Sequence, residues 1–271
     1  MKKVFLPTDF SENARQSLDY AARLFANEPV EFIIIHTYDN PPTPAHVTST
    51  KLAETIEADS IYDLEKEKRH LQGVLENSES TITILSRKGA LSSVLKQAGE
   101  NRSVDLIIMS PRGAGRNAGF GSNTLAVMRN SEIPVLVIME DKHFYPFSKI
   151  LFAADLVGYS RDTLLFPLDY FVRQFNSTIE VVHFGSEDTE EKSKVMEDLV
   201  AIFGEERCHV EYINEENVLD GLNKTIETHV PDLLVLVNRH RWFFSKLFIK
   251  SVTRNMIVDS PIPILILHDK A

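Results

Sequence analysis

Residues 104–139 decide the fold, and they read VDLIIMSPRGAGRNAGFGSNTLAVMRNSEIPVLVIM. The apolar run Leu106–Met109 has the length of a buried strand, and it leads into a loop that is rich in glycine between residues 113 and 121. A segment with the apolar spacing of a helix begins at Ser122, and a second apolar run follows Pro134. The stretch therefore predicts a strand, a glycine-rich loop, a helix and a second strand.

The loop between this strand and this helix is the best candidate for a binding site. Glycine lets a backbone approach a ligand closely, and the free N–H groups of a helix's first turn attract anions, so the arrangement suits a phosphate. It matches neither common phosphate loop, because no Lys-Ser or Lys-Thr follows Gly121, and the Gly-x-Gly-x-x-Gly frame set by Gly113 and Gly115 ends on Ala118. A turn that merely requires positive φ is the alternative interpretation.

The rest of the first half alternates between strands and helices. We predict strands at Lys2–Thr8, Val30–Thr37 and Thr81–Ser86, and helices starting at Ser11, within Ala45–Glu76, and from Leu91 to Gln97. The second strand is almost continuously apolar, as is typical of strands covered on both faces in a parallel sheet. The order β-α-β-α-β-α-β-α-β predicts an α/β fold with a doubly wound parallel sheet and right-handed crossovers.

The same pattern restarts after a predicted linker, Asp141–Phe147. Residues 149–155 (KILFAAD) repeat residues 3–9 (KVFLPTD), and residues 260–267 (SPIPILIL) repeat residues 131–138 (SEIPVLVI). We therefore predict an internal duplication, with one domain over residues 1–140 and a shorter one over residues 148–271.

Composition excludes several classes of function. A net charge of −10 argues against a nucleic-acid partner, which calls for clustered Lys and Arg. The single cysteine, Cys208, rules out an internal disulfide framework and fits a small buried residue better than a reactive thiol. No apolar segment approaches the roughly 18 residues of a membrane span, and the N-terminus lacks a signal-peptide pattern, so we expect a cytoplasmic protein without membrane contact.

Three features together resemble the universal stress protein family. They are Pro-Thr-Asp-Phe-Ser at residues 7–11, a histidine that ends the second strand, and a glycine loop that closes on Gly121-Ser122. The resemblance covers nearly the whole chain as two tandem copies. It implies the nucleotide-binding α-hydrolase type of α/β fold, packed as an intrachain pseudo-dimer through the strands Val135–Ile138 and Ile264–Leu267, with a homodimer as a further option. The protein partner stays unknown.

The family resemblance also implies a stress-response role and a ligand. Members divide into those that bind ATP in the glycine loop and those that do not, so an adenine nucleotide (ATP, ADP or AMP) would be a regulatory or signalling ligand of the first domain, with Mg²⁺ only alongside it. The implied nucleotide-binding residues are Pro7, Asp9, Thr37, Met109, Ser110, Arg112, Gly113, Gly121, Ser122, Asn123 and Thr124.

Departures from the family pattern concern the loop. Ser110 stands where the family has its first glycine, and seven residues separate Gly113 from Gly121, where the pattern has nine. We therefore expect a weaker or shorter ligand, with AMP or ADP bound at least as well as ATP. A Gly121→Val side chain is expected to project into the anion site. In the second copy His240 and Lys250 replace the loop glycines, so we expect at most one nucleotide per chain.

Simpler interpretations exist for several of these residues. Asp9 with Glu12 three residues later fits a helix capping box, His36 fits a satisfied structural histidine, and Arg112 fits an ordinary exposed loop arginine. No set of nucleophile, base and orienting group emerges, so catalysis is not predicted and weak ATP hydrolysis has no identified base. The alternative function is a scaffold without nucleotide, acting through the aromatic loop at residues 242–249.

Overall fold

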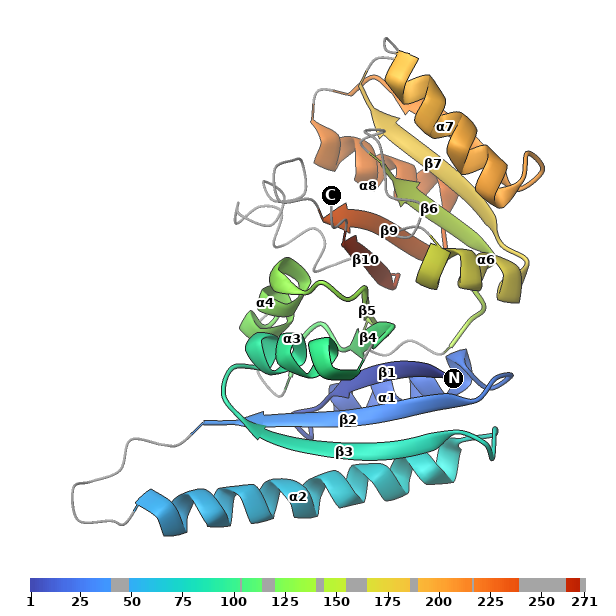
Figure 1. The fold of residues 1–271 in the computed structure, drawn as a ribbon. Coiled ribbons are helices and arrows are strands. Elements are labelled where there is room, and N and C mark those ends of the chain that lie inside the picture. Colours follow the sequence, from blue (N-terminus) through green and yellow to red (C-terminus); the bar gives the residue numbers. More distant parts are fainter. Residues whose placement is uncertain are drawn as a thin grey trace. The chain divides into compact units, whose positions relative to one another are not determined.

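The structure is a computed structural model of the chain, which divides into two compact units, Met1–Phe144 and Tyr145–Ala271. Each unit combines parallel strands with helices (Figure 1). The α/β class predicted from the sequence is therefore confirmed. The residues that the structure describes are 1–39, 49–102, 104–113, 120–139, 144–154, 165–185, 190–215, 217–238 and 262–268.

The first unit alternates strands and helices throughout. Its elements are β1 (Lys2–Pro7), α1 (Glu12–Leu24), β2 (Val30–Tyr38), α2 (Ser49–Val74), β3 (Thr81–Lys88), α3 (Leu91–Arg102), β4 (Leu106–Met109), α4 (Ser122–Asn130) and β5 (Val135–Val137). The strands pair in parallel in the order β3-β2-β1-β4-β5, as a doubly wound sheet requires. The predicted parallel sheet is confirmed for this unit.

The centre of this sheet is β1, which pairs with β2 on one side and with β4 on the other. Val4 lies opposite both Phe32 and Leu106, and all three side chains are fully buried. The chain leaves β1 toward β2 and β3 on one side and later returns to β4 and β5 on the other. In such sheets a crevice opens where the carboxyl ends of the two central strands diverge, and ligands bind there.

Helix α2 is highly charged, and one side of it is anchored rather than solvated. Glu67 is 2% exposed and accepts hydrogen bonds from Arg15 of α1, whose Nε lies 3.2 Å from Oε2 and whose Nη2 lies 2.5 Å from Oε1. His70 Nε2 lies 2.6 Å from Asp19 Oδ1, also on α1. Tyr62 of the same helix is exposed. These contacts therefore hold α2 against α1, while other side chains of the helix reach the solvent.

The second unit repeats the strand order of the first. Its elements are β6 (Lys149–Ala153), η1 (Leu165–Asp169), α6 (Tyr170–Phe175), β7 (Thr178–Phe184), α7 (Glu190–Phe203), β8 (Cys208–Ile213), α8 (Val218–His229), β9 (Leu233–Asn238) and β10 (Ile264–His268). Parallel pairing gives the order β10-β9-β6-β7-β8, which corresponds to β5-β4-β1-β2-β3. The two units thus share one topology.

One hydrogen-bond pair recurs in both units at the start of the central strands. The amide N–H of Lys3 donates to Asp105 Oδ2 (2.8 Å), while the Asp105 N–H donates to the Lys3 carbonyl (2.9 Å). Lys149 and Asp232 repeat both bonds at 2.9 and 2.8 Å. The repeated Lys and Asp residues therefore have the same structural role, which fixes the first central strand to the segment that enters the other.

Two predictions about the second half can be compared with the structure. Phe147, predicted as the end of the linker, is fully buried and packs edge-on against Phe171 and Phe175, so it belongs to the core of the second unit. Cys208 begins β8 and is buried, and its burial raises the pKa of the thiol to about 11, as suits a structural cysteine. The second-copy residues His240 and Lys250 and the aromatic loop at 242–249 lie outside the described residues.

Candidate functional site

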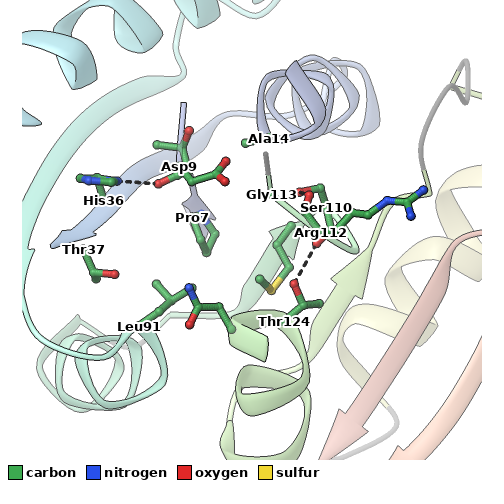
Figure 2. A pocket seen from close by; sticks show the side chains of 13 residues that line it. Pro7, Asp9, Ala14, His36, Thr37, Leu91, Ser110, Arg112, Gly113 and Thr124 are labelled. Atoms are coloured by element: carbon green, nitrogen blue, oxygen red, sulfur yellow. Dashed lines mark hydrogen bonds between the residues drawn. The ribbon is translucent and has the colours of Figure 1, made fainter. Parts of the chain in front are cut away.

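A pocket opens at the carboxyl ends of β1, β2 and β4, where the strand order reverses (Figure 2). The empty space within it and its mouth, open solvent included, is about 490 Å³. The first turns of α1, α3 and α4 each contribute to its wall. The lining residues are Pro7, Thr8, Asp9, Ala14, His36, Thr37, Leu91, Met109, Ser110, Arg112, Gly113, Asn123 and Thr124.

Most of the residues implied by the family resemblance meet in this pocket. Those that line it are Pro7, Asp9, Thr37, Met109, Ser110, Arg112, Gly113, Asn123 and Thr124. Gly121 and Ser122 do not line it, although they begin α4 beside it. Sequence reasoning missed Thr8, Ala14, His36 and Leu91 as lining residues. For Thr8 and His36 the signal was available, because each directly adjoins a residue that was chosen.

The turn between β1 and α1 holds Asp9 in place. The Ser11 N–H and Oγ–H both donate to Asp9 Oδ1, at 3.1 and 2.5 Å. Ser11 is the N-cap of α1, and its Oγ accepts from the Ala14 N–H at 3.3 Å. The predicted capping box of Asp9 and Glu12 is therefore wrong. The helix begins later than a cap at Asp9 would require, because the left-handed backbone of Phe10 (φ 64°) turns the chain before Ser11.

Gly113 lies against the carboxylate of Asp9. A Cβ built at Gly113 would come within 1.8 Å of Asp9 Oδ2, so only glycine lets this carboxylate pack against the loop backbone. A Cβ at Gly121 would instead meet the backbone of Pro111 and Arg112 at ordinary contact distances, the shortest being 3.6 Å to Arg112 Cα. The Cβ itself therefore meets the turn after β4, and the expected projection of the longer Gly121→Val side chain into the anion site stays a prediction.

Positive φ does not explain either of these glycines. The glycines with positive φ in the described residues are Gly89, Gly185 and Gly204, and Gly121 has a φ of −61°. The alternative that Gly113 and Gly121 merely permit a left-handed turn is therefore wrong. Close approach of other groups to Gly113 is the reason that the structure gives for that position.

Hydrogen bonds close the base of the glycine loop. The Gly121 N–H donates to the Pro111 carbonyl (2.8 Å), and Thr124 Oγ1 donates to the Ser110 carbonyl (3.2 Å). Ser110 Oγ donates to the Arg112 carbonyl (3.0 Å). The Ser110 hydroxyl thus stabilises the turn that leaves β4.

Helix α4 points the start of its first turn toward the pocket. Its N-cap is Gly121, which offers no side-chain cap, while Asn123 and Thr124 of the first turn line the cavity. Backbone N–H groups and the positive end of the helix dipole therefore face this end of the pocket, as anion binding requires. The Arg112 guanidinium is directed away from Asp9, His36 and Thr37 (Figure 2), so in this arrangement it lies outside the space between them.

The histidines that end β2 and β7 make the same backbone contact. His36 Nδ1 lies 2.8 Å from the Thr8 carbonyl oxygen, and His183 Nδ1 lies 3.0 Å from the Ala154 carbonyl oxygen. Each bond satisfies one ring nitrogen, as the structural interpretation of His36 requires. His36 differs in that it also lines the pocket, whereas His183 is 6% exposed.

In the described part of the chain, no group of three or more His, Cys, Asp and Glu side chains is placed to hold a metal ion. None of the helices in the described ranges is long and apolar enough to cross a membrane.

The first unit is a parallel α/β sheet with a pocket at its switch point, the place where doubly wound folds commonly hold ligands. The model of the universal stress protein family matches residues 1–139. The chain therefore belongs to the universal stress protein family.

Solved structures resemble the chain over almost its whole length. A universal stress protein from Archaeoglobus fulgidus DSM 4304 has a TM-score of 0.73 at 17% sequence identity, covering 98% of this chain and 96% of that chain. A functionally unknown protein from Pseudomonas aeruginosa PAO1 has a TM-score of 0.59 at 15% identity, covering 99% and 93%. Likeness at this identity concerns the fold alone. No protein with a curated description matches in sequence.

Proposed function

We propose that the first unit binds an adenine nucleotide in the pocket at the ends of β1, β2 and β4, and that this ligand regulates a stress-response protein that is not an enzyme. One observation carries the proposal. Residues chosen from the family pattern, which come from four separate segments of the sequence, line a single pocket at the topological switch point of the sheet.

The pocket supports a nucleotide with a short phosphate chain. The α4 N-terminus can hold a phosphate through its backbone N–H groups. The loop that would wrap further phosphates is tied at its base by the bond from Gly121 to Pro111, and the Asp9 carboxylate lies against Gly113. A carboxylate in that position repels additional phosphate charge. We therefore propose that AMP or ADP binds at least as tightly as ATP, with Mg²⁺ only as a companion of the nucleotide.

Isothermal titration of the full chain with AMP, ADP and ATP tests this proposal. We expect one nucleotide per chain, with an affinity for AMP or ADP equal to or above that for ATP. A stoichiometry of two would contradict the assignment to the first copy alone. Absence of heat and of any thermal shift with all three nucleotides would favour the scaffold function instead.

We also propose that the two copies form an intrachain pseudo-dimer through β5 and β10. Within its own unit each of these strands ends the sheet order and is short and apolar. An open edge of this kind invites pairing or aggregation and needs cover.

A double-mutant cycle tests the pseudo-dimer. We expect Val137→Asp and Leu265→Asp each to lower the free energy of unfolding, and their combined effect to fall short of the sum by about 1 kcal/mol, because residues in contact share interactions. Strictly additive effects in urea denaturation would count against pairing of these strands.

A further inference from the structure

The imidazole of His36 is held in one tautomer. A carbonyl oxygen can only accept a hydrogen bond, so the 2.8 Å contact between His36 Nδ1 and the Thr8 carbonyl requires a proton on Nδ1. In the neutral ring the other nitrogen, Nε2, is then a hydrogen-bond acceptor. His36 is half-buried and lines the pocket. His36 at the end of β2 therefore carries an acceptor of fixed identity, Nε2, on a ring that lines the pocket.

The aromatic ring of Phe10 packs against the imidazole of His36 and restricts its orientation. Its ring centroid lies 4.3 Å from the His36 ring centroid at an interplanar angle of 37°. Phe10 has a φ of 64°, which is rare for a bulky side chain and costs about 1–3 kcal/mol. The Phe10 N–H donates to Thr8 Oγ1 at 3.0 Å, so the turn that bears the strain also presents the carbonyl that orients His36. Such strain is typical of a functional position.

His183 in the second unit provides an internal comparison. It makes the same Nδ1 contact with the Ala154 carbonyl, but it is 6% exposed and meets the edge of Tyr212 at a centroid distance of 5.9 Å. A Cβ at Gly185 would lie 3.4 Å from His183 Nε2, so backbone crowds that nitrogen. The bond to the carbonyl alone is therefore structural in both units. His36 differs from His183 in that it lines the pocket and packs against Phe10.

The two ends of the pocket carry different residues. Figure 2 places His36 and Thr37 at one end, and Ser110 and Thr124 beside α4 at the other. A mononucleotide whose phosphate lay at the α4 N-terminus would therefore have its base toward the end with His36.

We infer that His36 selects the base of the nucleotide: its Nε2 accepts a hydrogen bond from an amino group on the base, and Phe10 positions the imidazole for that bond. The inference rests on the proposed function. Adenine carries an exocyclic amino group, whereas hypoxanthine carries a carbonyl oxygen there, which sets an acceptor against an acceptor. An acceptor that the bound ligand covers without supplying a donor lowers the affinity for the wrong ligand.

The test compares AMP with inosine monophosphate (IMP) by isothermal titration. We expect wild-type protein to bind AMP about tenfold more tightly than IMP. His36→Asn retains an N–H that can donate to the Thr8 carbonyl but lacks Nε2, so its AMP-to-IMP ratio should fall to about one. His183→Asn makes the same change in the second unit and should keep the tenfold ratio.

Phe10→Asn separates ligand selection from folding. Asparagine tolerates positive φ, so this variant relieves backbone strain while it removes the ring that packs on His36. We expect its thermal stability to be unchanged or higher. Its preference for AMP over IMP, measured as the ratio of the two affinities, should be about one third of the wild-type preference. In ¹⁵N NMR of wild-type protein, AMP should move the His36 Nε2 resonance and leave Nδ1 protonated.

The outcomes separate this inference from the proposed function. If AMP binds wild-type protein but IMP binds equally well, or if His36→Asn keeps the preference, the role of His36 is overturned and nucleotide binding stands. An Nε2 resonance that AMP leaves in place also overturns it. If AMP does not bind wild-type protein, both proposals fall.

Discussion

Replacement of Gly113 by alanine is expected to weaken AMP binding roughly thirtyfold, which corresponds to about 2 kcal/mol. The added Cβ would lie 1.8 Å from Asp9 Oδ2, so the carboxylate must leave its position. Asp9 would then lose its hydrogen bonds from Ser11, which hold it at 3.1 and 2.5 Å. The displaced side chain would lie in the pocket that it now borders. Isothermal titration with AMP measures the loss.

Gly121→Ala is the matched control for Gly113→Ala. Its Cβ would have ordinary contacts with Pro111 and Arg112, and its φ of −61° suits any residue. We expect this variant to bind AMP within about twofold of wild type, and both variants to retain the thermal midpoint within a few degrees. Equal AMP affinity in the Gly113→Ala and wild-type proteins would show that the space beside Asp9 is not used by the ligand.

The second large effect concerns the contact between α1 and α2. Arg15→Leu removes the cation that donates to the carboxylate of Glu67, which is 2% exposed, and leaves that charge buried without compensation. Breaking a buried pair in this way costs about 3–5 kcal/mol. Because the Arg15 side chain is 39% exposed and solvent screens the pair, we expect a smaller loss of about 2–3 kcal/mol.

Hydrogen exchange of the buried amides in β1 and β2 measures this loss for the first unit alone. Glu67→Gln leaves only the partly exposed Arg15 to be solvated, so it should cost about 1 kcal/mol. The exposed pair of Lys66 and Asp63 is the control, and Asp63→Asn should leave exchange unchanged. If Arg15→Leu lowers the free energy of unfolding no more than Glu67→Gln does, the uncompensated buried carboxylate does not cause the expected difference between the two variants.

Much of the fold followed from hydrophobic periodicity. The predicted strands overlap β1, β2 and β3 because their apolar runs are buried in a parallel sheet. Helix ends were less certain, since α3 continues to Arg102 beyond the predicted Gln97 through residues with weak periodicity. Phe147 was assigned to a linker because Pro146 and polar neighbours mask one buried aromatic residue. Such an assignment depends on tertiary packing, which a local pattern does not contain.

The site was predictable where short motifs meet the ends of strands. Asp9, Thr37 and Gly113 line the pocket, as the family pattern implied. Ala14 and Leu91 could not be found this way, because small and apolar residues on helices are usually core residues. The strained backbone of Phe10 was also invisible in sequence, since φ depends on the hydrogen bonds of the whole turn.

The closed base of the glycine loop has an evolutionary consequence. The bonds from Gly121 to Pro111 and from Thr124 to Ser110 join the end of β4 to the start of α4 without using any residue between them. Lengthening the intervening segment by two residues would cost roughly 0.2 kcal/mol of closure entropy. Insertions and deletions can therefore accumulate there without disturbing the sheet, so the segment can change in length while one scaffold is kept.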